Sequence, residues 1–169
     1  DLPAKAGATL LVYGDAKRPA RVLLVATGEE SPAGEKSWNE AVRGALRQLA
    51  TLAGNEAVSL LHEAEAAGRG LEWRLRSQVG LGRESAYRFD RLKSKKDPKP
   101  GGPARLALLV ERAQAQAAER AVSQAVALAN GMDLAKDLGN LPGNLCTPEY
   151  LAEAARGLAR DWKLKVQVL

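Results

Sequence analysis

The first stretch of the chain alternates between short apolar runs and turn residues. Residues 8–13 and 20–26 are apolar and rich in β-branched side chains, and residues 14–19 between them supply turn chemistry. This pattern predicts a strand, a turn and a second strand. Because the second run is almost continuously apolar, we expect that strand to be covered on both faces.

An amphipathic helix is predicted next. Ser37 and Glu40 have the spacing of a capping box, with Ser37 as the N-cap. Apolar residues then recur at helical spacing as far as Leu52, and Gly54 is placed to end the helix. Residues 56–61 follow as another strand candidate. Strand, helix and strand in this order indicate a right-handed crossover and a largely parallel or mixed sheet.

The middle of the chain gives weaker signals. Residues 71–86 have helical periodicity, although Gly80 and Gly82 each cost a helix about 1 kcal/mol relative to alanine. Residues 93–103 contain three prolines and two glycines, which predicts a loop. Residues 105–110 predict another buried strand. The whole pattern predicts an α/β fold, with a mixed sheet flanked by helices.

The longest helical signal covers residues 116–138 and would span about 35 Å, enough to connect two domains. Thr147 then stands as an N-cap before a proline, predicting a helix from Pro148 to about Asp161. Residues 163–169 alternate like a strand. Since the chain starts with Asp1 and an unpaired strand needs a partner, we expect a truncated or processed product.

Composition places the chain among ordinary globular proteins. Of its 169 residues, 46% are hydrophobic and 27% are charged, which suits one well-formed core. Cys146 is the only cysteine and indicates a reducing compartment. No apolar run approaches the roughly 20 residues that a membrane span needs. The expected location is the cytoplasm, with no membrane partner.

Positive charge is concentrated in one stretch. The net charge is +5, and residues 88–99 contain six cations and two acids, which is +4 of that total. A basic loop attracts polyanions by neutralising phosphates. The candidate nucleic-acid-binding residues are Lys93, Lys95, Lys96 and Lys99. A solvated loop with no ligand is the alternative interpretation.

No self-contained catalytic site is visible in the sequence. His62 is the only histidine, and at the end of a buried strand it is expected to be structural. Asp133 and Asp137 have a metal-pair spacing on one helix face, but Lys136 lies between them and no histidine follows. Cys146 is interpreted as a small residue filling a turn. We therefore assign no catalytic and no metal-binding residue.

Residues 133–152, DLAKDLGNLPGNLCTPEYLA, resemble the segment that joins the two domains of leucine aminopeptidases. The family pattern is R/K-D-L-x-N-x-P-x-N-x-x-T-P-x-x-L-A, from which Gly139 and Gly143 are mild departures. Residues 21–28, 68–73 and 87–93 also resemble stretches of the bacterial members. The resemblance covers nearly the whole chain, and the joining segment is its most specific part.

The resemblance implies a macro-domain-like N-terminal α/β domain, a linking helix and a catalytic C-terminal domain. The expected boundaries are residues 1–115, with the front missing, then 116–141 for the linker and 142–169 for the start of the catalytic domain. Members of the family are hexameric cytosolic peptidases that use two divalent metals, manganese or zinc, to release N-terminal amino acids from peptides. Their catalytic motifs do not occur here, so the segment itself is expected to be a structural and oligomerisation scaffold without activity of its own.

Two other functions remain open at this point. Some bacterial members resembling this chain also bind DNA, which makes a DNA-binding regulatory module the alternative, through residues 88–99. Nucleotide binding is a third option, but Gly80 and Gly82 only half match a GxGxxG loop and do not follow a strand into a helix.

Overall fold

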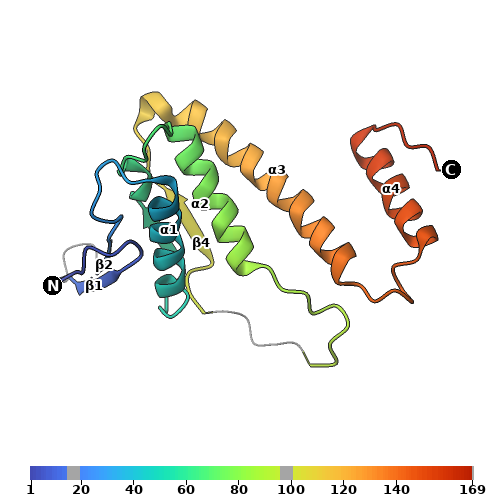
Figure 1. Ribbon diagram of the computed structural model, residues 1–169, viewed down its shortest axis with the longest axis horizontal. Coiled ribbons are helices and arrows are strands. Elements are labelled where there is room, and N and C mark those ends of the chain that lie inside the picture. The colour runs from blue at the N-terminus through green and yellow to red at the C-terminus, as the bar shows by residue number, and fades with distance from the viewer. Residues whose placement is uncertain (15–19, 96–100, 169) are drawn as a thin grey trace. The chain divides into compact units, whose positions relative to one another are not determined.

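The computed structural model describes residues 1–14, 20–95 and 101–168. Figure 1 shows how the chain alternates between short strands and longer helices. The strands are β1 (Thr9–Tyr13), β2 (Arg21–Val25), β3 (Glu56–Ser59) and β4 (Arg105–Leu108). The α-helices are α1 (Glu35–Leu49), α2 (Leu71–Ala86), α3 (Ala115–Asn140) and α4 (Pro148–Trp162). Two 3-10 helices are η1 (Leu61–Glu63) and η2 (Arg112–Gln114).

The predicted α/β class is confirmed, with small sheets flanked by helices. The described strands form two two-stranded sheets: β1 pairs antiparallel with β2, and β3 pairs parallel with β4. The parallel crossover therefore runs from β3 through α2 to β4. The sequence pattern placed such a crossover one step earlier, through α1. In addition, β2 was expected to be covered on both faces, and this is wrong because Val22 and Leu24 are exposed.

The N-cap of α1 is Gly34 and not Ser37, so the predicted start of this helix is too late. Gly34 caps without a side-chain hydrogen bond, and its carbonyl accepts from the Trp38 N–H at 2.9 Å. Ser37 therefore lies inside the first turn. The Glu40 carboxylate faces Arg47 at 2.7 Å instead of closing a capping box. The helix also ends at Leu49, ahead of the residue expected to end it.

The later helices follow the prediction closely. Helix α2 covers residues 71–86 in spite of its two glycines, and Thr147 caps α4 as expected. The strand expected at residues 163–169 is wrong. Lys163 adopts a left-handed conformation with φ 54° that ends α4, and residues 164–168 have no regular structure. Within the described residues this segment has no strand to pair with, so its backbone lacks the ladder that a strand requires.

The chain divides into two compact units, residues 1–129 and residues 130–169. The core of the first unit has two clusters. In one, Trp38 and Val42 are buried, and the Trp38 ring lies 5.4 Å from that of Trp73. In the other, Leu75 from α2 packs with Ala118 and Ala121 from α3. Among the described residues, no helix combines the length and apolarity needed to cross a bilayer.

Candidate functional site

The basic segment after α2 is described only in part. Lys93 and Lys95 are exposed, whereas Lys96 and Lys99 lie outside the described residues. Arg88 lies back over the end of α2, where its guanidinium donates to the carbonyls of Ser85 and Tyr87. Residues 87–95 contain no helix or strand that would fit a DNA groove. Nucleic-acid binding by the four lysines remains a prediction.

A large hollow opens beside this segment, within the first unit. Its volume is about 1450 Å³, and it lies between α1, α2, β4 and the first half of α3. Most of its lining is apolar, including Leu46, Val79, Leu106 and Val122. Small-molecule sites are usually smaller, about 300–1,000 Å³, and hold a few convergent polar groups. The hollow is therefore larger than a usual small-molecule site.

One partly buried polar cluster links β3 to α2. Ser59 Oγ donates to Gln78 Oε1 at 2.8 Å and accepts from the Leu61 N–H at 3.2 Å. Gln78 is only 3% exposed, and its Nε2 has no partner among the described atoms. Nothing in the sequence pattern singled out these two residues. The only available signal was a glutamine on the apolar side of a weakly amphipathic helix.

His62 lies in η1, directly after β3, and is 2% exposed. Burial lowers the pKa of its imidazole, while a hydrogen bond with the backbone of Leu109 and the charge of Glu63 act against that shift. Arg74 lowers the pKa further. A neutral, buried imidazole tied to the chain after β4 is what a structural histidine needs. The expected structural role fits this placement.

Metal-binding side chains do not converge in the described part of the chain. No group of three or more His, Cys, Asp or Glu residues could hold an ion there. Asp133 and Asp137 lie half-buried, one turn apart on α3. Cys146 is half-buried in the loop before α4, where its N–H donates to the Pro142 carbonyl at 2.9 Å. A single helix turn and a lone thiol do not make a two-metal centre.

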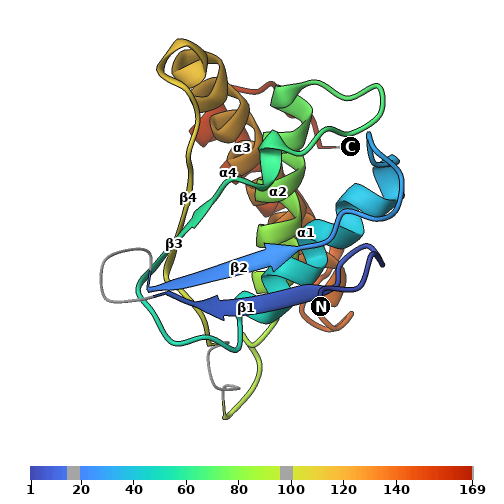
Figure 2. The ribbon, with the colours of Figure 1, turned by 90° about the vertical axis from the view of Figure 1, so that its left-hand side faces the viewer.

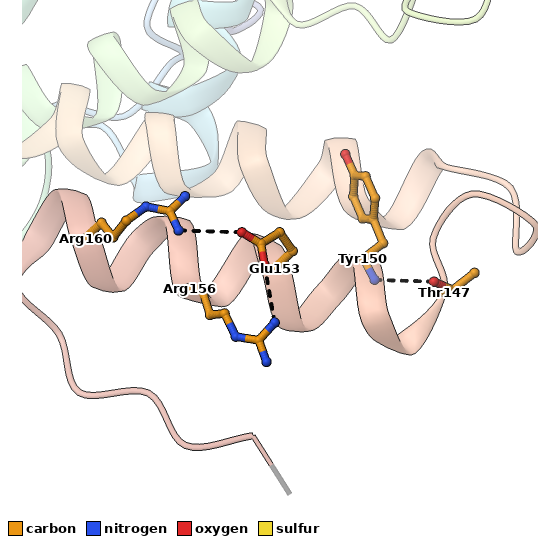
Figure 3. Close-up of polar contacts among 5 residues, drawn as sticks. All are labelled: Thr147, Tyr150, Glu153, Arg156 and Arg160. Atoms are coloured by element: carbon orange, nitrogen blue, oxygen red, sulfur yellow. Dashed lines mark hydrogen bonds and ion pairs between the residues drawn. The ribbon is translucent and has the colours of Figure 1, made fainter.

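Local hydrogen bonds order the joining segment, residues 133–152. The Pro142 carbonyl also accepts from the Leu145 N–H at 2.9 Å, which closes the turn between α3 and α4. Thr147 Oγ1 then accepts from the Tyr150 N–H at 3.3 Å, as Figure 3 shows. Further along α4, Glu153 faces Arg156 and Arg160 at 3.3 and 3.5 Å. These contacts cap and order a helix and offer no reactive group.

Comparison with known proteins decides the family. The model of the cytosol aminopeptidase family, N-terminal domain, matches residues 1–96, more than half of the 169. The chain belongs to the cytosol aminopeptidase family. A "Probable cytosol aminopeptidase" of Ralstonia pickettii is 44% identical over 174 residues, covering 100% of this chain and 35% of that protein. One from Herminiimonas arsenicoxydans is 46% identical over 145 residues, covering 86% of this chain and 29% of that protein.

The chain also resembles solved structures. The "Bottromycin maturation enzyme BotP in complex with Mn" matches with a TM-score of 0.73 at 25% identity, over 96% of this chain and 32% of that one. The chain thus spans about a third of the length of the proteins it matches. The expected resemblance to leucine aminopeptidases is confirmed, and residues 1–96 correspond to the N-terminal domain of the family.

Proposed function

We propose that this chain is the N-terminal, non-catalytic portion of a leucyl-type metalloaminopeptidase, which releases N-terminal amino acids from peptides in the cytoplasm. One observation supports this most strongly: similarity to cytosol aminopeptidases runs along 100% of the chain yet reaches only 35% of the relative's length. Peptide hydrolysis would then depend on the remaining two thirds. The role of residues 1–169 would be to scaffold that part.

The buried groups of the first unit are consistent with a scaffold. Gln78 and His62 are buried inside the unit, and the half-buried Ser59 bonds to Gln78. None of the three combines a nucleophile with an activating base at an open surface. Two divalent ions, manganese or zinc, would be bound by the rest of the longer protein. The similarity to BotP, which was solved in complex with Mn, supports manganese as the first metal to try.

The decisive experiment compares two proteins. The longer protein should hydrolyse a leucyl peptide substrate when supplied with Mn²⁺ or Zn²⁺, and the 169-residue chain should not. A metal chelator should abolish the activity of the longer protein. Leucyl-substrate turnover by the 169-residue chain itself, or inactivity of the longer protein with every divalent metal, would contradict the proposal. Sedimentation of the longer protein tests whether it forms the expected hexamer.

DNA binding is kept as a second proposed function because the described part of the basic segment is exposed. Arg91, Lys93 and Lys95 all lie at the surface beyond α2. Exposed cations on a loop suit contacts with phosphates rather than with base edges. Binding would therefore be strongly salt-dependent and weakly selective for sequence.

A further inference from the structure

The hollow between α1, α2, β4 and the first half of α3 has one apolar wall. Alternate residues of a strand share one of its faces, and residues four apart on a helix share a stripe. Both kinds of set line the hollow: Leu106, Leu108 and Val110 from β4 and its continuation, and Ala118, Val122 and Val126 from α3. We call these six residues the apolar wall. Leu106 and Val126 are 38% and 37% exposed, so the wall opens to solvent.

The lining contributed by α1 and α2 carries positive charge. Figure 2 shows α1 beside α2, on the side away from β4. Arg43 of α1 lies 3.9 Å from Glu84 in the last turn of α2, and both are about half exposed, so this ion pair is weak. Arg83 precedes Glu84, and Arg88 donates to backbone carbonyls at the same end of the helix. The whole lining has four arginines and two glutamates, which leaves an excess of positive charge.

The dimensions of the hollow suit a long ligand better than a compact one. Its volume of about 1450 Å³ exceeds the upper end of the usual range for compact ligands, about 1,000 Å³. The lining of α3 runs from Ala115 to Val126, which is about 16 Å of helix at 1.5 Å per residue. An extended apolar chain could therefore lie along the apolar wall and remove much of it from water.

We propose that the hollow binds a long-chain monocarboxylate, a fatty acid, with its chain along the apolar wall and its carboxylate at the arginines near the end of α2. A guanidinium group pairs with a carboxylate through two parallel hydrogen bonds, which a neutral ligand cannot make. A compact anion would leave the apolar wall in water, so both halves of the ligand are needed. The inference goes beyond the proposed function and does not depend on it, because it involves no catalytic group.

Isothermal titration calorimetry with sodium dodecanoate, below the concentration at which it forms micelles, tests the proposal. One dodecanoate should bind per chain. Decanoate, which is two CH₂ groups shorter, should bind up to about fifteenfold more weakly, because each buried CH₂ strengthens binding by up to about fourfold. Decanol, which has the chain of decanoate without its charge, should bind at least about tenfold more weakly than decanoate. Equal affinities for decanoate and decanol, or several weak sites per chain, would overturn the proposal.

Two matched pairs of variants locate the site at partly exposed positions, where folding should be retained. Arg43 lines the hollow and Arg76 does not, although both side chains are 45% exposed and each faces one glutamate. Arg43→Gln should weaken dodecanoate binding at least about fivefold, and Arg76→Gln should leave it unchanged. Val126→Glu places a carboxylate on the apolar wall and should weaken binding at least about tenfold, whereas Leu128→Glu, at an exposed position of α3 outside the wall, should not. If the two members of each pair behave alike, the ligand does not occupy this hollow.

The longer protein should bind dodecanoate as well. If the 169-residue chain binds it and the longer protein does not, another part of the polypeptide occupies the hollow and the proposal fails. Sedimentation with phosphatidylglycerol vesicles separates a free ligand from a membrane surface, and binding to vesicles without binding of monomeric dodecanoate would also count against it. A longer protein that binds dodecanoate but hydrolyses no peptide keeps this inference and removes the aminopeptidase proposal.

Discussion

Ser59 Oγ and Gln78 Oε1 are joined by a hydrogen bond of 2.8 Å that ties β3 to α2 inside the first unit. The Gln78 side chain is buried, so its carbonyl oxygen cannot readily turn to water in place of Ser59. A buried acceptor that loses its donor costs about 1–3 kcal/mol. This single hydrogen bond therefore contributes measurably to the packing of the parallel crossover.

Ser59→Ala is expected to lower the free energy of unfolding by about 1–3 kcal/mol, because the Gln78 oxygen would stay buried without a donor. Urea unfolding of the 169-residue chain measures it. Ser85→Ala is the matched control, since Ser85 Oγ also donates a 2.8 Å bond, to the Gly82 carbonyl, but at an exposed site. A loss at Ser59→Ala no larger than that of the control would contradict the assignment.

Stability should fall in mild acid because of His62. Burial lowers the pKa of this imidazole in the folded chain below the value of about 6.5 for an unfolded one. The folded state therefore prefers the neutral form. Its contribution to stability is fully present above the unfolded pKa and is lost as the pH falls from there through the lower folded pKa.

The measurement is the urea midpoint at pH 7.5 and at pH 5.0, for the native chain and for His62→Gln. When the pH falls from 7.5 to 5.0, the native chain should lose more stability than His62→Gln does. The comparison with the variant is needed because the exposed carboxylates Glu40 and Glu149 also have lowered pKa values in the folded chain. Equal losses in both proteins would show that His62 does not drive the dependence.

Two helical glycines should respond to alanine in opposite directions. A Cβ at Gly44 in α1 would lie 2.2 Å from the Gly7 carbonyl oxygen, closer than any real contact, so the backbone segments must separate. Gly44→Ala should cost about 1–3 kcal/mol, as overpacking does. A Cβ at Gly80 in α2 meets nothing within 4 Å, and Gly80→Ala should raise stability by up to about 1 kcal/mol.

Thermal unfolding of both variants provides the check, each acting as the other's control. For a chain of this size 1 kcal/mol corresponds to a shift of roughly 2–4 °C in Tm. A rise in Tm for Gly44→Ala would mean that α1 and the segment around Gly7 do not approach as closely as described.

Local patterns in the sequence were sufficient to predict most elements. The glycines of α2 did not prevent the helix, because Leu75 and Gln78 are buried against neighbouring elements and packing outweighs propensity. The threonine cap of α4 depends only on adjacent residues, so it was predictable. Helix ends that are set by backbone contacts were not predictable, as the N-cap of α1 at Gly34 shows.

Contacts between segments that are distant in the sequence could not be predicted from the sequence pattern. The Ser59–Gln78 bond and the close approach of Gly44 to Gly7 both depend on how strands and helices pack. The pattern correctly marked β2 as apolar on both faces, yet it could not show that α1 covers only one of them and that Val22 and Leu24 are exposed on the other.

The basic segment allows a last prediction, on salt dependence. If the proposed DNA binding is correct, replacing Lys93, Lys95, Lys96 and Lys99 with glutamine should make the slope of log affinity against log salt concentration less steep. The slope should change by up to about 3.6, roughly 0.9 for each phosphate that is no longer neutralised. Fluorescence anisotropy with a labelled duplex at several salt concentrations measures the slope. Affinity should fall similarly for unrelated duplex sequences, because loop cations bind phosphates.

The matched control is a second fourfold variant in which Lys5, Lys36, Lys163 and Lys165 are replaced with glutamine. All four are exposed, and the net charge falls from +5 to +1 in both variants. Since the overall charge is the same, any difference in slope reports position rather than charge. If both variants flatten the slope equally, attraction is a property of the whole surface and residues 88–99 are not a binding site. If the native chain shows no salt-dependent binding, these lysines form a solvated loop.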